Sequence, residues 1–139
     1  AAFILEKRKN TIYSISKIQS IIKLPLLAEI SVGKNQSWEE SLDLFASSEI
    51  LETNKSIALV VIGELDKSVL NKFSKSFEKV LTKENFKITT DLREATKYNK
   101  LIMLTALGNT KIKELVEIKN KLSLPKNPIL GHIVITYNN

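Results

Sequence analysis

Cysteine is absent from this 139-residue chain, and its absence removes several kinds of chemistry. Disulfides, thiolate metal sites and thiol nucleophiles are excluded, and a chain without disulfides suits a reducing compartment. The single histidine, His132, has no carboxylates at a spacing that would complete a metal site. We therefore expect no metal and no other cofactor.

Long apolar runs and aromatic side chains are also scarce. No run reaches the length of about 18 apolar residues that marks a membrane helix, so nothing in this sequence is expected to span a bilayer by itself. Aromatic residues make up only 6% of the chain, which leaves few surfaces on which single-stranded nucleic acid could stack.

Positive charge is what the chain has in excess, with a formal net charge of +6. Nucleic acid, anionic lipid headgroups and acidic polymers are the partners that this charge allows. Most lysines are dispersed, as on an ordinary solvated surface, but Lys7, Arg8 and Lys9 directly follow five apolar residues and Glu6. An apolar end that runs into a basic cluster is typical of a membrane helix leaving on the cytoplasmic side. An ordinary chain terminus has the same pattern, so both interpretations stay open.

Hydrophobic spacing predicts alternating helices and strands. Helices are expected over residues 14–23 and 37–51, after Asp66, near 92–98 and from Ile112; strands are expected over 26–30, 57–62, 86–90, 101–106 and 129–136. Residues 57–62 and 101–106 are continuously apolar, as in strands buried on both faces of a parallel sheet. The order predicts a three-layer α/β fold, a small and mostly parallel sheet with helices on both faces. Residues 1–36 are expected to form a basic exit, a short helix and a linker, and residues 37–139 the α/β domain.

The turn after residues 57–62 is the first place to seek a ligand, because such sheets bind ligands beyond the carboxyl ends of their strands. Lys67 and Ser68 match the last two residues of a phosphate-binding loop, in which the lysine neutralises phosphate charge and the hydroxyl helps to hold Mg²⁺. Asp66, however, stands where that motif needs glycine. Its side chain obstructs the loop and its carboxylate repels phosphate, so we favour a helix capped by Asp66.

Other candidate residues are weaker. Asp91 and Arg93 follow a predicted strand, where a solvated turn is a simpler interpretation than a metal or phosphate site. His132 lies in an apolar strand and is expected to be a packed or edge histidine. No general acid–base pair and no nucleophile motif stands out, so no catalytic residue is assigned and the chain is not expected to be an enzyme.

Taken in order, these segments resemble the cytoplasmic part of the Wzz-type polysaccharide co-polymerases that are fused, or once were fused, to a bacterial tyrosine-kinase domain. The segments that carry the resemblance are the basic exit with residues 24–30, the helix, strand and turn over residues 37–68, the stretch 88–93, and residues 101–134 with Gly108 and Thr110 at a helix start. The resemblance implies a truncated fold of the P-loop NTPase type.

Several positions depart from the family pattern. Asp66 replaces the phosphate-loop glycine, and Thr89 replaces the first aspartate of a second acidic motif. The interval between Arg93 and Leu101 is too short for the strand that carries the family's Walker B aspartate. In the family's assembly motif, E-x-x-R-x-x-R, Glu40 is kept but Asp43 and Ala46 replace both arginines. Tyr137 is the one tyrosine near the end of this sequence, where the family has a cluster.

The resemblance implies a non-catalytic cytosolic domain of an inner-membrane regulator of polysaccharide chain length, in exopolysaccharide or lipopolysaccharide synthesis. Expected partners are a second copy of the chain, the polymerase machinery and, through segments outside this sequence, the membrane; nucleic acid is not expected. Lys7, Arg8 and Lys9 would meet the membrane surface, and Lys67 and Ser68 would be an inactive remnant. Two alternatives stay open: a weak nucleotide-binding domain with kinase-like activity, and a basic nucleic-acid-binding domain.

Overall fold

The computed structural model describes residues 10–33, 37–54 and 56–137. Its elements are α2 (Ile15–Ile22), β1 (Leu26–Val32), α3 (Ser37–Ala46), α4 (Glu49–Thr53), β2 (Ile57–Ile62), α5 (Lys67–Glu78), β3 (Phe86–Thr89), α6 (Leu92–Ala95), β4 (Lys100–Ala106), α7 (Ile112–Leu122) and β5 (Ile129–Tyr137). Each predicted helix and strand is therefore present, with most boundaries shifted by a few residues. Lys7, Arg8 and Lys9 lie outside the described residues.

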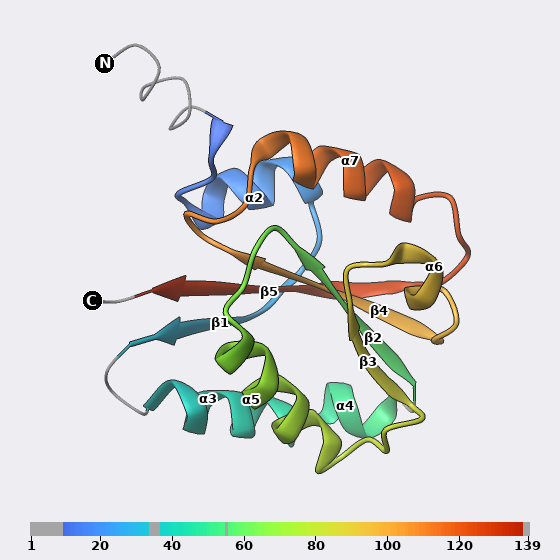
Figure 1. The fold of residues 1–139 in the computed structure, drawn as a ribbon. Coiled ribbons are helices and arrows are strands. Elements are labelled where there is room, and N and C mark those ends of the chain that lie inside the picture. The colour runs from blue at the N-terminus through green and yellow to red at the C-terminus, as the bar shows by residue number, and fades with distance from the viewer. Residues whose placement is uncertain (1–9, 34–36, 55, 138–139) are drawn as a thin grey trace.

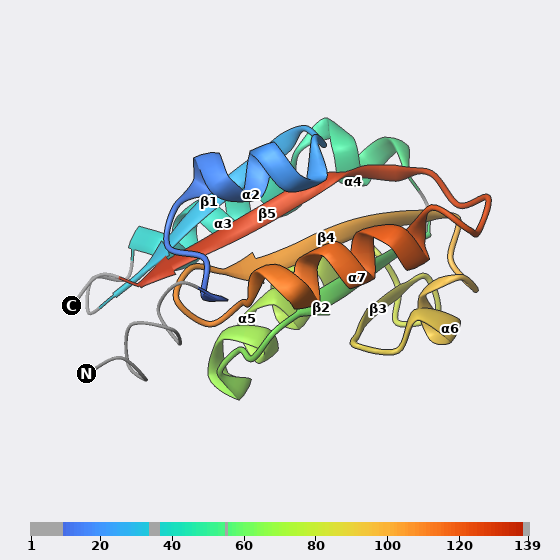
Figure 2. The same ribbon diagram turned by 90° about the horizontal axis from the view of Figure 1, so that it is seen from above.

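The sheet has five strands in the order β1-β5-β4-β2-β3, and every neighbouring pair is parallel. Helices α2, α6 and α7 cover one face, and α3, α4 and α5 cover the other (Figure 1). Seen from above, α2 and α7 lie side by side over the sheet (Figure 2). The predicted three-layer α/β fold is confirmed.

The chain changes direction across the sheet after β3. It runs from β1 to β2 and on to β3 with its helices on one face, then returns to β4 and β5 with its helices on the other face. Reversing both the direction and the face preserves the hand of each crossover, as parallel sheets require. Because α5 leaves β2 on one face and α7 leaves β4 on the other, a crevice opens between the ends of these two strands.

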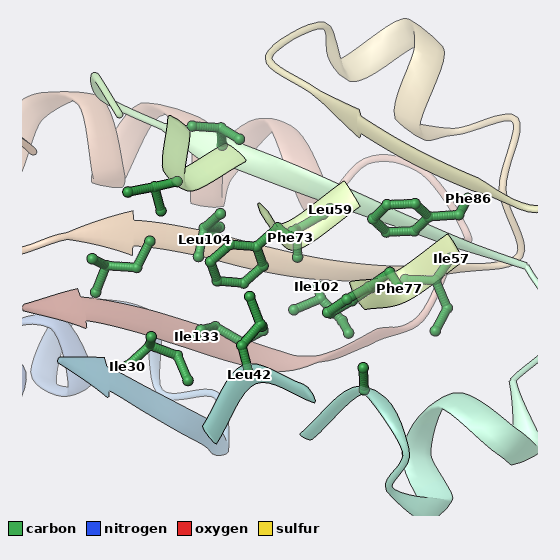
Figure 3. Packing of buried hydrophobic residues seen from close by; sticks show 14 of the residues in the cluster. Ile30, Leu42, Ile57, Leu59, Phe73, Phe77, Phe86, Ile102, Leu104 and Ile133 are labelled. Carbon is green, nitrogen blue, oxygen red and sulfur yellow. The ribbon is translucent and has the colours of Figure 1, made fainter. Parts of the chain in front are cut away.

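The core explains why the apolar runs predict strands correctly. All six residues of β2 are buried, since helices cover both of its faces. On the α5 side, Phe73 and Phe77 lie over β2 and β4 (Figure 3). Phe77 also packs on Phe86, with ring centroids 4.9 Å apart. Such burial contributes about 25 cal/mol per Å² of apolar surface and stabilises the strands that border the crevice.

The helix predicted over residues 37–51 is wrong in its length, because α3 ends at Ala46 and α4 begins at Glu49. The Ser47 hydroxyl donates to the carbonyl oxygens of Asp43 at 3.0 Å and Leu44 at 3.2 Å. The carbonyl of Ser48 then accepts from Leu51 and Glu52 to start α4. A hydroxyl that competes for backbone partners is a common reason for a helix to end.

Two further predictions concern the segment over residues 1–36 and the interval between Arg93 and Leu101. β1 pairs with β5, and Ile18 and Ile22 of α2 are buried, so α2 and β1 belong to the same sheet and core as the elements that follow. Residues 90–99, all of them described, hold only α6, which confirms that no strand fits between Arg93 and β4. None of the helices in the described ranges has the length and apolarity of a membrane span.

Candidate functional site

The candidate site is the crevice at the carboxyl ends of β2 and β4. It encloses about 600 Å³ and is lined by Thr11, Gly63, Glu64, Gly108, Asn109, Lys111, Lys113 and Glu114. This is where doubly wound sheets bind their ligands. Its lining combines two lysines, two glutamates and backbone, so opposite charges are balanced within it.

The two turns that border this crevice are locked together. Gly63 has a φ of 87°, and a Cβ added to it would lie 2.5 Å from the carbonyl oxygen of Asn109. The hydroxyl of Thr110, which is fully buried, donates to the carbonyl oxygen of Ile62 at 3.0 Å. The amide of Glu64 points to the same Asn109 oxygen at 3.5 Å. A protein carbonyl therefore lies against the turn in which a phosphate loop would wrap a ligand.

Lys67 and Ser68 begin α5, as the sequence predicts, and both are exposed. Neither residue lines the crevice, because α5 leaves β2 toward the face opposite α7. Asp66 takes the N-cap position, but its side chain makes no cap hydrogen bond. The prediction that the Asp66 side chain caps α5 is therefore wrong, although its position at the helix start is correct.

The start of α7 carries its own anion. Oε1 of Glu114 accepts a hydrogen bond from the amide of Lys111 at 3.2 Å. A carboxylate in the first turn of a helix offsets the partial positive charge of the helix N-terminus. A phosphate at this end of the crevice would have to displace that carboxylate.

Asp91 and Arg93 form a solvated turn, as the simpler interpretation predicts. Oδ1 of Asp91 accepts from the amide of Arg93 at 2.9 Å, which caps α6. The hydroxyl of Thr89 accepts from the amide of Asp91 at 2.9 Å. Both residues line a separate groove of about 690 Å³ between α6 and the end of α7, away from the crevice. Across the described ranges, no group of three His, Asp or Glu side chains could hold a metal ion.

His132 is a packed histidine, which agrees with its expected structural role. Its side chain is fully buried, and Nε2 lies 2.5 Å from Oε1 of Gln19. Burial lowers the pKa of the His132 imidazole, because a low-polarity environment disfavours its charged form. The neutral ring thus joins α2 to β5 and takes no part in the crevice.

Sequence analysis missed a charged cluster between α3 and α5. The Ser76 hydroxyl donates to Oδ1 of Asp43 at 2.5 Å, and Lys72 and Lys79 lie within 3.9 Å of the same carboxylate. The hydrogen bond from Ser76, with help from both lysines, lowers the pKa of Asp43. Only the spacing of the two lysines, which places both on one face of α5, could have indicated this cluster. Asp43 and the buried Ala46 thus face their own chain.

Tyr137, the last residue of β5, lies within the sheet, where it pairs with Val32 of β1. Burial, followed by the negative charge of Asp66, raises the pKa of the Tyr137 hydroxyl. The Tyr137 side chain is partly buried against the core, with its hydroxyl near Asp66 at the start of α5.

No protein-family model, curated protein or solved structure matches this chain. Its function has to be inferred from its own residues and their geometry.

Proposed function

We propose that this chain is a non-catalytic cytosolic domain of an inner-membrane regulator of polysaccharide chain length, and that it acts in assembly or partner binding. Two things support the proposal. The order of its segments resembles that of the Wzz-type co-polymerases. At the crevice in which a nucleotide-binding protein of this fold would hold phosphate, the Asn109 carbonyl lies against the turn at Gly63.

One observation carries the non-catalytic part of the proposal: the Asn109 carbonyl lies only 2.5 Å from where a Cβ on Gly63 would be. A phosphate loop needs a run of free amides around a hollow large enough for phosphate oxygens. Here the Glu64 amide points at Asn109, and the Glu114 carboxylate occupies the facing helix start. The crevice lining carries two lysines and two glutamates, so it offers a triphosphate no net positive charge.

Calorimetric titration of the whole chain with Mg-ATP tests this part directly. We expect no binding in the sub-millimolar range, and the same result for Lys67→Ala. Asp66→Gly supplies the glycine that the motif has directly before its lysine and is the sharper control. It should also fail to bind, because the Asn109 carbonyl remains in place. Sub-millimolar binding that Lys67→Ala abolishes would favour the alternative, a nucleotide-binding domain with kinase-like activity.

The polysaccharide role is tested in the cell that makes this protein, with the full-length gene product. Deletion of residues 10–139 should shift the length distribution of a surface polysaccharide on a gel. Lys67→Ala and Ser68→Ala should leave that distribution unchanged, because neither side chain reaches the crevice. An unchanged distribution after the deletion would contradict the proposal. In this setting Lys7, Arg8 and Lys9 would face anionic lipid headgroups.

A further inference from the structure

The two border strands of the sheet differ in how well they are protected from pairing with another strand. β1 forms one border and β3 the other (Figures 1 and 2). β3 has four residues and carries the exposed Lys87, two features that discourage edge pairing. β1 has seven residues, no lysine and no proline, and Glu29 is its one charged residue. β1 is therefore the open border.

The direction of the β1 backbone groups follows from hydrogen bonds deeper in the sheet. The amide of Leu107 donates to the carbonyl of Ile135 at 2.9 Å, so the backbone groups of Ile135 face β4. Ile135 is the partner of Ile30 in the β1–β5 pairing. Because the backbone groups of Ile135 face away from β1, the N–H and C=O groups of Ile30 must face β5 to make the hydrogen bonds of this pair. Successive residues of a strand alternate, and the N–H and C=O groups of Glu29 and Ser31 therefore face the open border. Within the described residues, neither amide nor carbonyl has a backbone hydrogen bond outside the β1–β5 pairing.

This arrangement is self-complementary. If a second β1 runs antiparallel with Ile30 opposite Ile30, then Glu29 of each copy lies opposite Ser31 of the other copy. Each Glu29–Ser31 pair exchanges two backbone hydrogen bonds. The two pairs related by the two-fold axis therefore make four hydrogen bonds. The irregularity between Leu26 and Ala28 confines regular pairing to the carboxyl half of the strand. Its centre is then Ile30.

Side chains favour this register over its neighbours. Glu29 and Ser31 are both exposed, and the Ser31 hydroxyl lies 2.9 Å from that of Thr136, so their face of the border is polar. A register centred on Glu29 would set two carboxylates opposite one another, which is unfavourable. The register centred on Ile30 sets each carboxylate opposite a hydroxyl.

The other expected surface for self-association is used within the chain. In α3, Asp43 is engaged by Ser76, Lys72 and Lys79, and Ala46 is 2% exposed. In the alignment with the family's assembly motif these positions replace its two arginines, and here Asp43 is held by residues of its own chain while Ala46 is buried in the core. Self-association through α3 would need this cluster to open.

We propose that two copies of this chain pair through β1, antiparallel about Ile30, to form one continuous sheet across a two-fold axis. The proposal rests on the proposed function in one respect: attachment to a membrane would raise the local concentration and so strengthen a small interface. The pairing itself requires only the open border of β1.

Sedimentation velocity of the whole chain, from micromolar to millimolar concentration, tests the proposal. We expect a reversible dimer. Ser31→Glu places a second carboxylate opposite Glu29 of the other copy, twice in each dimer, and should raise the dimer dissociation constant about tenfold or more. The double variant Glu29→Lys with Ser31→Glu converts both contacts into opposite-charge pairs and should restore the dimer. Ser41→Glu makes the same charge change on an exposed position of α3 and should have no effect.

Amide hydrogen exchange on the unmodified chain gives a second test that does not depend on any variant folding. Exchange at Glu29 and Ser31 should slow as the concentration rises, while exchange at Ile88, whose backbone groups face the open border of β3, should not. A monomer throughout the range, a dimer indifferent to Ser31→Glu, or unchanged exchange at Glu29 and Ser31 would overturn the proposal. All three outcomes are independent of the Mg-ATP titration and the polysaccharide assay, which test the function itself.

Discussion

The turns after β2 and β4 begin alike and differ in what lies against them. Gly63 and Gly108 each follow a buried strand, with φ of 87° and 86°. A Cβ on Gly63 would lie 2.5 Å from a carbonyl oxygen, whereas a Cβ on Gly108 would meet only the ring of Tyr13 at 3.8 Å. In the turn after β2, glycine is needed because the Asn109 backbone comes close to it. In the turn after β4, glycine is needed only for its left-handed backbone conformation. The first turn is thus in close contact with its neighbour, and the Asn109 carbonyl borders the crevice at that point.

Gly63→Ala should have the largest effect. It adds left-handed strain to a collision with backbone that cannot easily move, and should lower the free energy of unfolding by about 3 kcal/mol or more. Urea denaturation followed by circular dichroism measures this loss. A loss below about 1 kcal/mol would mean that the two turns separate readily, contrary to the locked arrangement.

Thr110→Val comes next. It keeps the shape of the side chain but leaves the carbonyl of Ile62 without its donor, at a cost of about 1–3 kcal/mol. Thr110→Ser retains the hydroxyl and is the matched control, expected to cost less. If both variants unfold at the same urea concentration, the hydroxyl does not join the two turns.

Gly108→Ala should cost about 1–2 kcal/mol, since only the left-handed backbone opposes the new methyl group. The informative quantity is its difference from Gly63→Ala under the same denaturation conditions. Equal losses for the two alanine variants would remove the distinction between the two turns.

Asp66→Asn should lower the pKa of Tyr137, because it removes the nearby negative charge that helps to raise it. The pKa should stay above the ordinary value of about 10, since burial is the larger cause. Absorbance titration of the phenolate, with Tyr137→Phe to identify the signal, measures the change. An unaltered titration would place Asp66 too far from Tyr137 to act on it.

Lys67→Ala should have the smallest effect, within about 0.5 kcal/mol of the parent, because the side chain is exposed and lies outside the crevice. A thermal melt with and without added Mg-ATP makes the comparison. A stabilisation by nucleotide that this variant loses would show that the turn after β2 binds phosphate after all.

The parts of the fold that depend on local pattern were predictable. The apolar runs that became β2 and β4 are buried on both faces, and Ser14 caps α2 through the amide of Lys17 at 3.2 Å. The break after Ala46 was not predicted, although Ser47 and Ser48 carry a local signal for it. Whether these two serines end the helix depends on how α3 and α4 pack against the rest of the protein.

The site was only partly predictable. The place of Asp66 at the start of α5 was predicted correctly, and its incompatibility with a phosphate loop stays a prediction. The contact between Gly63 and Asn109 could not be predicted, because it depends on the order of β2 and β4 in the sheet. The cluster around Asp43 likewise requires α3 and α5 to lie side by side. Contacts between distant segments are set by register, which the hydrophobic pattern does not specify.

The most direct measurement is a crystal structure of this chain soaked with a magnesium nucleoside triphosphate at millimolar concentration. We predict that the crevice between Gly63 and Glu114 holds no triphosphate and that the Asn109 carbonyl stays against Gly63. Density for a triphosphate enclosed by the backbone amides of residues 63–68, with Asn109 displaced, would contradict the non-catalytic assignment.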